Sequence, residues 1–553
     1  MPAYAIGLDY GTNSCRSLII DLADGRELGS AVFPYPSGNL GILTDGNDAN
    51  VARQNPQDYL DGAVDIVTKA ISQARQNDLN FSTEDIVGMG IDTTGSTIIP
   101  VDEEGTPLAF REKFKRNLDA HVWLWKDHTA HEEAAKITEL ASEHRPHYLA
   151  KCGGIYSSEW WWSKIWRIKT VAPDVFKAAH TFVEHCDWLP ATLTGTAANP
   201  KRGICSAGHK AMFSDEWGGL PDKEFLALLD PALNEKEWFD TAYTADEVAG
   251  KLTAEWAQKL NLPEGLPVAV GAFDAHMGAV GAGVKEGTLT KVLGTSTCDI
   301  MVAPADKELA DIPGVCGIVN GSVLPNYYGI EAGQSAVGDI FLWFVNHLVP
   351  DSYGHSMGEK FDRLLEEIIT LRPGQSGLLA LDWNNGNRTI LVDQTLTGLM
   401  LGQTLHTTAG EIYRALIEAT AFGALTIINR IKEHGVAVDE VICTGGLSLK
   451  NPTLMQIYAD IIGLPLKVSV SEQTCALGAA IFGAVAGGHG NLLEIQSKVT
   501  RLLDQVYTPD KDAQKTYAEL FELYSDLHDA FGTKEWSGNL HHVMKRLLEL
   551  KKA

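Results

Sequence analysis

The sequence predicts an α/β protein made of two similar halves that face a shared cleft. Residues 4–21 (YAIGLDYGTNSCRSLIID) and 289–303 (LTKVLGTSTCDIMVA) each read as a strand, a turn rich in glycine and hydroxyl side chains, and a second strand. Residues 440–452 then repeat the strand and glycine turn of residues 86–97. We therefore infer a duplication, with the boundary between the halves near residues 284–288.

The other elements of the first half follow from local patterns. Residues 28–34 form a third strand after a turn, and residues 56–75 form an amphipathic helix with Leu60, Val64, Val67 and Ile71 on one face. Residues 86–101 again read as strand, turn and strand. The stretch from 110 to 250 is helix-rich, and we expect most of its tryptophans in the core. A buried strand at 266–273 ends at Asp274, and a helix with a stripe of small residues follows it.

This pattern divides the chain into three parts. We expect an N-terminal domain over residues 1–284 that ends just after Asp274 and its helix, and a second α/β domain over residues 285–490. Residues 491–553 read as a helical tail packed on the second domain.

Composition narrows the class of partner. The net charge of −26 argues against nucleic acid and anionic membranes as partners, but a local pocket can still take an anionic substrate. No apolar run approaches the roughly 18 residues of a membrane span. Eight cysteines without a C-x-x-C pair indicate reduced thiols rather than a zinc site. With no secretory signal at MPAYAIGLDYG, these features predict a cytoplasmic protein.

The two hairpin tips are candidate phosphate sites. Neither a P-loop nor a G-x-G-x-x-G turn between a strand and a helix is present. Successive backbone N–H groups in turns such as 11–14 and 294–297 can form an anion-binding concavity. One such tip alone reads as a plain polar turn, whereas two at matching places favour phosphates held from both sides. Asp9 precedes the first tip, where it either caps the turn or meets a Mg²⁺ ion on the phosphates.

Further candidates are carboxylates and aromatic residues. Asp274 lies at the N-cap of its helix, which is a structural role, but also at the carboxyl end of a strand, where ligands bind in α/β sheets. There it could take the proton from a substrate hydroxyl. Trp125 next to Asp127, together with Lys210 and Glu331, suits a polyol, while solvated surface charge is the alternative for Lys210 and Glu331.

Several peptides together resemble the FGGY carbohydrate kinases over essentially the whole chain: GLDYGTNSCR, GAFDAHMGAVGAG, GTSTCD, TGGLSLKN and the helix that follows LTGLMLGQ. The peptides LWKDHTA, GGIYSSEW and GICSAGHK are most similar to the members that phosphorylate L-ribulose. The resemblance implies two actin/hexokinase-like (ribonuclease H-like) domains around a central cleft. It also implies that ATP lies mainly on the second domain and the sugar mainly on the first.

The resemblance also implies roles for individual positions. Asp274 is then the catalytic base and Asp9 faces Mg²⁺. The first phosphate loop comprises Thr12, Asn13, Ser14 and Arg16, and the second comprises Gly294, Thr295 and Ser296. The adenosine pocket comprises Gly333, Gly445, Gly446 and Asn451. The sugar contacts are Ser96, Trp125, Asp127, Lys210, Asp274 and Glu331. One departure from the family pattern is Trp166, which follows Lys164 one position early.

The implied function is ATP- and Mg²⁺-dependent phosphorylation of L-ribulose to L-ribulose 5-phosphate, a step of L-arabinose catabolism. Two alternatives remain open from the sequence. One is a kinase for another ketose or polyol, such as xylulose or glycerol. The other is an actin-like ATPase without a small substrate, which has no need of the polyol cluster. The expected partners are therefore a small sugar, ATP and Mg²⁺, and the sequence leaves homo-oligomer formation open.

Overall fold

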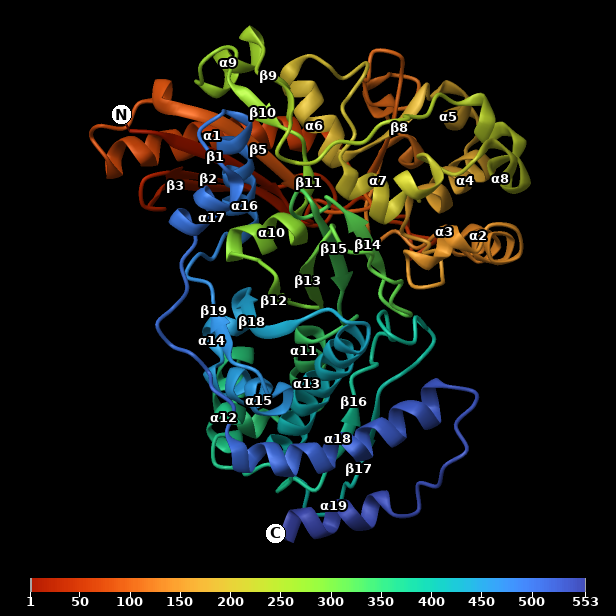
Figure 1. Cartoon of the computed structure of the whole chain (residues 1–553), viewed down its shortest axis with the longest axis vertical. Coiled ribbons are helices and arrows are strands. Elements are labelled where there is room, and N and C mark those ends of the chain that lie inside the picture. The colour runs from red at the N-terminus through yellow and green to blue at the C-terminus, as the bar shows by residue number, and fades with distance from the viewer. Residues whose placement is uncertain (1, 553) are drawn as a thin grey trace.

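The computed structural model describes residues 2–552 and contains two main sheets, one in each half of the molecule (Figure 1). The first sheet has the order β3-β2-β1-β5-β10-β9, with β11 beside β5. Its central hairpin β1–β2 is antiparallel, and β5 runs parallel to β1. The strands are β1 (Tyr4–Tyr10), β2 (Ser14–Asp21), β3 (Glu27–Pro34), β5 (Ile86–Thr93), β9 (Val248–Lys251), β10 (Pro267–Ala269) and β11 (Ala272–Phe273).

The second sheet repeats this plan. Its order is β14-β15-β13-β12-β18-β19, with an antiparallel hairpin β12–β13 and with β18 parallel to β12. The predicted duplication into two α/β halves is therefore confirmed at the level of strand order. The strands are β12 (Gly287–Leu293), β13 (Thr297–Pro304), β14 (Gly317–Asn320), β15 (Tyr327–Ala332), β18 (Val438–Thr444) and β19 (Leu466–Val468).

Two helices that are distant in sequence lie side by side between the sheets: α10 (Asp274–Ala282) and α16 (Thr474–Ala486). Their backbones are so close that a Cβ on Gly281 would lie 2.0 Å from the Thr474 carbonyl oxygen, and one on Gly478 1.8 Å from that of Met277. The small-residue character predicted for the first helix is thus required by packing.

The structure differs in one respect from the expected division at residues 284 and 490. α16 packs against β1 and β5 of the first sheet, and α17 (Leu492–Val499) joins the same hydrophobic cluster. Residues 474–499 therefore leave the second half and return to the first. Local sequence patterns carry no information about this long-range contact, and the exact boundaries stay a prediction.

The region from 98 to 260 forms the outer part of the first half. β6 (Ile98–Val101) follows β5 after a short turn but joins a separate four-stranded sheet of order β4-β7-β6-β8. The tryptophans here are mostly buried, as expected, including Trp123, Trp161, Trp162 and Trp188. The other strands are β4 (Arg53–Gln54), β7 (Val122–Trp123) and β8 (Thr181–Glu184). The helices are α2 (His131–His144), α3 (His147–Ala150), α4 (Trp161–Val171), α5 (Pro173–Ala178), α6 (His185–Thr194), α7 (Ile204–Lys210), α8 (Lys223–Leu229) and α9 (Ala254–Leu260).

The helix predicted at 56–75 is α1 (Pro56–Asn77), which packs on β2 and β3. Of the four predicted apolar positions, Val67 and Ile71 are buried, while Leu60 and Val64 lie at the edge of the contact. The buried face is rotated toward Ala63, Ala70 and Ala74, since alanines allow close approach to β3. A Cβ on Gly29 of that strand would lie 2.1 Å from the Ala70 carbonyl oxygen.

The second half is completed by helices and a tail. Arg414 of α13 donates to the Tyr517 hydroxyl of α18 at 2.8 Å, so the tail is bonded to the second half. None of the helices within residues 2–552 is long and apolar enough to cross a membrane. The elements are α11 (Gly338–His347), α12 (Met357–Ile368), β16 (Leu379–Leu381), β17 (Leu399–Leu401), α13 (Ala409–Glu433), α14 (Gly446–Lys450), α15 (Pro452–Ile462), α18 (Lys511–Gly532) and α19 (Val543–Lys552).

Candidate active site

A cavity of about 210 Å³ lies between the two halves and is lined by residues from both. Of the residues predicted to form the site, seven line this cavity: Thr12, Ser96, Trp125, Lys210, Asp274, Ser296 and Glu331. Members of the predicted phosphate loops and of the predicted sugar cluster thus meet in one space, although they lie as far as 319 residues apart in sequence.

Asp274 is placed where β11 ends and α10 begins. Phe273 is the N-cap residue and Asp274 is the first residue of the helix, so its predicted N-cap position was wrong by one residue. Its Oδ1 accepts a hydrogen bond from the Ala275 N–H at 2.6 Å. Burial, reinforced by the negative charge of Asp9, raises the pKa of Asp274 to about 7. A carboxylate with such a pKa is suited to accept a proton near neutral pH.

A second buried carboxylate, Asp92, faces Asp9 and was missed by the sequence analysis. The two are direct neighbours on the parallel strands β1 and β5. Both carboxylate oxygens of Asp92 are buried without a hydrogen-bond partner in the described chain, and Arg16 approaches Asp9 at 3.5 Å. Burial raises the pKa of both acids. The signal was present in GIDTTGST, whose acid occupies the same strand-end position as Asp9 in GLDYGTN. Two buried carboxylates with a single arginine fit a divalent cation.

The first phosphate loop is held by its neighbours. Trp125 donates its indole N–H to Thr12 Oγ1 at 3.0 Å, and Gln54 donates to the Thr12 carbonyl oxygen at 2.8 Å. The Asn13 side chain donates to the Leu40 carbonyl oxygen at 2.7 Å and is therefore committed to the adjacent loop. Arg16 reaches Ser14 Oγ at 3.4 Å. Of the residues of this tip, Thr12 lines the cavity.

The second phosphate loop is anchored to α11. The carbonyl oxygens of Gly294 and Thr295 accept hydrogen bonds from Gly338 and Val337 at 3.1 and 2.8 Å. Gly445 has φ +90° and lies against the end of β12, where a Cβ would be 2.4 Å from the Leu293 carbonyl oxygen. The next residue, Gly446, begins α14.

Asn451 and Gly333, the other two positions of the predicted adenosine pocket, each have close contacts with the surrounding backbone. The Asn451 side chain caps α15 by accepting from the Leu454 N–H at 2.9 Å. Gly333 follows β15 directly, and a Cβ there would lie 2.1 Å from the Thr297 carbonyl oxygen. The adenosine role of Gly333, Gly445, Gly446 and Asn451 stays a prediction.

The residues predicted to contact the sugar include an ion pair that joins the two halves of the molecule. Lys210 at the end of α7 lies 3.2 and 3.3 Å from the two carboxylate oxygens of Glu331 on β15. Burial opposes ionisation of Glu331, but the Lys210 ammonium outweighs it and holds the pKa of Glu331 well below its usual range. Both groups are therefore charged and ready to bond hydroxyl groups.

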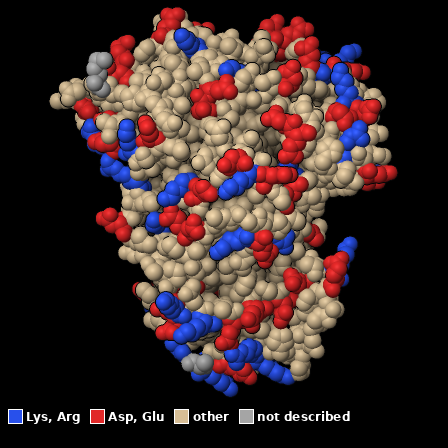
Figure 2. Space-filling view, in the orientation of Figure 1, with Lys and Arg blue, Asp and Glu red and all other residues tan. Residues whose placement is uncertain are grey.

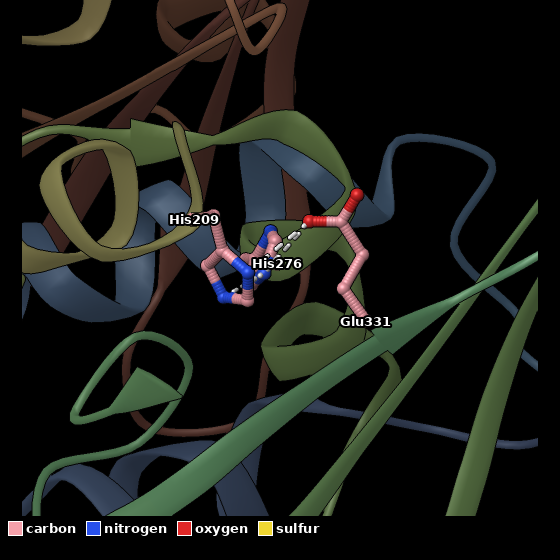
Figure 3. A group of neighbouring side chains, drawn as sticks. All are labelled: His209, His276 and Glu331. Atoms are coloured by element: carbon pink, nitrogen blue, oxygen red, sulfur yellow. Dashed lines mark hydrogen bonds and ion pairs between the residues drawn. The ribbon is translucent and has the colours of Figure 1, made fainter. Parts of the chain in front are cut away.

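Two histidines, His209 and His276, lie beside the carboxylate of Glu331 (Figure 3). Nε2 of His276 lies 3.2 Å from Nε2 of His209 and 3.7 Å from Glu331 Oε2, while His209 Nε2 also contacts Ser322 Oγ at 3.0 Å. Burial lowers the pKa of His276 to about 4 and that of His209 well below its ordinary value, so both rings are neutral. The three side chains are close enough to hold a metal ion, but Lys210 already balances the charge of Glu331. We interpret them as a support that orients this carboxylate. Sequence spacing could not reveal it, since the histidines are 67 residues apart.

Ser96 and the Trp125 loop are joined by a buried lysine. Lys164 donates to the carbonyl oxygens of Ser96 at 2.5 Å and of Leu124 at 2.8 Å. Ser96 has φ +53°, a left-handed conformation that costs energy for a side chain other than glycine. The lysine bond helps to hold this conformation at the cavity wall. Trp166, which lies one position earlier than in the family pattern, packs at the edge of the neighbouring hydrophobic cluster. Lys164 retains both hydrogen bonds.

Asp127 was predicted as a sugar contact, but the structure does not bring it to the cavity. Its side chain is fully buried, accepts from the Ala52 N–H at 2.8 Å and from Thr129 Oγ1 at 2.6 Å, and pairs with Arg53. The carboxylate is needed to balance the buried Arg53 guanidinium, because an unpaired charge in the core is costly. This pairing has no local sequence signal, since the two residues are 74 positions apart.

Comparison with known proteins agrees with this geometry. The model of the N-terminal domain of the FGGY family of carbohydrate kinases matches residues 4–281, and that of the C-terminal domain matches residues 289–487. The chain belongs to the FGGY family of carbohydrate kinases. As a member, it is a kinase that uses ATP and acts on a small sugar-like substrate.

Among curated FGGY relatives, a ribulokinase of Shouchella clausii is 42% identical, with 100% of this chain and 98% of the relative covered. A ribulokinase of Vibrio parahaemolyticus is 40% identical over 95% of each chain. Among solved structures, xylulose kinase from Rhodospirillum rubrum superposes with a TM-score of 0.79 at 23% identity, covering 95% of this chain and 98% of that one. Plasmodium falciparum glycerol kinase has a TM-score of 0.74 at 17% identity and covers 95% and 98%. The solved structures establish the shared fold.

The charged side chains and the cysteines are distributed as follows. On the face shown in Figure 2, acidic and basic side chains are interspersed, with no continuous basic stretch. All eight cysteines are free thiols and most are buried.

Proposed function

We propose that this FGGY kinase transfers the γ-phosphoryl group of ATP to the terminal hydroxyl of L-ribulose and forms L-ribulose 5-phosphate. The supporting observation is that Asp274, a buried carboxylate with a pKa near 7, shares one cavity with the charged pair Lys210–Glu331. In addition, relatives named ribulokinase match the chain over its whole length.

In this mechanism Asp274 accepts the proton of the sugar hydroxyl while the oxygen of that hydroxyl bonds to the γ-phosphorus. The bond between that phosphorus and the bridging oxygen breaks, and ADP leaves. The backbone of the loops 12–14 and 294–296, together with Arg16, holds the phosphate oxygens. Lys210 and Glu331 orient the sugar through its hydroxyl and carbonyl oxygens.

The carboxylates of Asp9 and Asp92 would hold Mg²⁺. The unpartnered, buried oxygens of Asp92 beside Asp9 fit such an ion, because two adjacent carboxylates without it repel each other. When bound with ATP, Mg²⁺ supplies positive charge to the phosphate oxygens.

A panel of acceptors tests the substrate. ADP release is measured with L-ribulose, D-xylulose and glycerol at fixed Mg²⁺ and ATP. We expect kcat/KM for L-ribulose to exceed the others by at least about 10-fold, because unpaired polar groups of the pocket penalise a mismatched substrate. A higher value for D-xylulose or glycerol would identify another sugar kinase. ADP release that does not depend on any acceptor would favour the actin-like alternative.

A further inference from the structure

Arg388 is a charged side chain in the sugar cavity that the mechanism above does not use. It lies in the connection between β16 and β17 of the second half and lines the cavity with Lys210, Asp274 and Glu331. Its Nη2 donates to the Thr297 carbonyl oxygen at 2.5 Å and lies 4.0 Å from Cys298 Sγ.

Most of the hydrogen-bonding capacity of Arg388 is unused. A guanidinium has five N–H donors, and only Nη2 has hydrogen-bond partners in the part of the chain that the structure describes. Nε is buried without a partner. Because a buried donor without an acceptor is unfavourable, a guanidinium kept in this state at a cavity wall indicates that a ligand supplies the acceptor.

The position of Arg388 identifies which ligand this is. Arg16 belongs to the first predicted phosphate loop and does not line this cavity, and its positive charge lowers the pKa of Asp9 and of Asp274. Arg388 instead lines the cavity together with Lys210 and Glu331, the pair proposed to hold the sugar, and its positive charge lowers the pKa of Glu331. The oxygen atoms available beside that pair are those of the sugar. The planar fork of arginine can donate two parallel hydrogen bonds to neighbouring oxygens, which a lysine cannot do.

We propose that Arg388 is a sugar-contact residue that donates hydrogen bonds to oxygen atoms of the bound ketopentose. This inference rests on the proposed function, because it takes the ligand of the cavity to be the ketopentose. Thr297 directly follows the second phosphate loop at 294–296, so the same guanidinium joins the sugar to the backbone that holds the nucleotide phosphates. A pocket that forms these hydrogen bonds discriminates among ketoses by the positions of their hydroxyl groups.

The first experiment measures sugar binding without nucleotide and steady-state kinetics for Arg388→Met and Arg388→Lys. Arg388→Met should weaken the Kd for L-ribulose and lower kcat/KM by at least about 10-fold, mainly through KM. Arg388→Lys keeps the charge but not the fork, and should give an intermediate value. Arg372→Met, which removes an exposed arginine of the same half, is the matched control and should resemble the parent protein. Thermal unfolding confirms that each variant is folded.

A second measurement uses L-ribulose analogues that each lack one hydroxyl. If Arg388 binds a particular oxygen, the analogue lacking it loses kcat/KM in the parent protein but loses much less in Arg388→Met, because the two changes remove the same interaction. An unchanged sugar Kd in both Arg388 variants overturns the inference. A lower kcat with an unchanged sugar Kd also overturns it, and places the guanidinium at the phosphoryl group. Failure of the parent protein to phosphorylate L-ribulose refutes instead the proposed function.

Discussion

Replacing Asp274 by asparagine separates its chemical role from its structural one. Asparagine retains the oxygen that accepts from the Ala275 N–H but cannot accept the substrate proton. Loss of a general base typically lowers the rate by about 10² to 10⁴. We therefore expect kcat of Asp274→Asn to fall by this factor while the melting temperature at pH 8 is unchanged or higher, because a buried negative charge is removed. A variant that unfolds but keeps its activity per folded molecule would show that Asp274 is only structural.

The pH dependence should report the same residue. Burial, and then the charge of Asp9, raise the pKa of Asp274 to about 7. Since a general base works only when deprotonated, kcat/KM for the sugar should be constant above this pKa and fall about tenfold per pH unit below it. The measurement is a rate profile between pH 5 and 9 at saturating ATP. A profile that stays flat down to pH 5 would contradict the assignment, because an ordinary aspartate remains ionised there.

At the residue scale, the sequence predicts the part of the candidate site whose signals are local. Gly11–Ser14, Asp274 and the 294–296 turn stand at strand ends, where both periodicity and motif are readable. Asp127 has a similar local context but is paired with Arg53, 74 positions away. His209, His276 and Arg388 approach Glu331 only after folding. Residues that act through a distant partner could not be assigned from their neighbours in sequence.

At the element scale, the contact between α10 and α16 holds the helix that begins with Asp274, the proposed base. A Cβ at Gly478 would lie 1.8 Å from the Met277 carbonyl oxygen, so Gly478→Ala must push α16 away from the helix that carries Asp274. We expect a loss of stability of about 1–3 kcal/mol, as for overpacking in cores, together with a lower kcat. Chemical denaturation and steady-state kinetics measure the two effects.

Gly358→Ala is the matched control for this change. Gly358 also lies in a helix, but the nearest atom to an added Cβ is 4.0 Å away. Alanine there should leave stability unchanged or raise it slightly, since it restricts the unfolded chain. Equal effects of the two substitutions would mean that the α10–α16 contact has no special importance.

Local elements followed the sequence closely, whereas two contacts between distant segments had no local signal. The hairpins at 4–21 and 289–303 and the helix at 56–75 form as predicted, because apolar periodicity and turn residues determine them. β6 joins a different sheet from β5, and α16 crosses to the first sheet. These pairings depend on contacts between residues distant in sequence, which a single sequence does not encode in any local pattern.

At the scale of the whole molecule, the repeated strand order places one sheet on each side of the cavity. Lys210 and Asp274 come from the first half, and Glu331 and Arg388 from the second. Kinases that bind substrates between two domains close over them and exclude water from the phosphoryl group. Small-angle scattering should show a smaller radius of gyration with L-ribulose plus a non-hydrolysable ATP analogue than with either alone. An unchanged radius under saturating ligands would argue against closure.

The reaction product shows whether the cavity couples ATP cleavage to phosphorylation of L-ribulose. Purified protein is incubated with Mg²⁺, ATP and L-ribulose, ADP is quantified, and phosphorus–proton correlation NMR locates the new phosphate. We expect one phosphate on the C5 oxygen of L-ribulose for each ADP released, and little ADP when the sugar is omitted. ADP formed at the same rate without sugar, or no phosphorylated L-ribulose despite ADP release, would contradict this expectation.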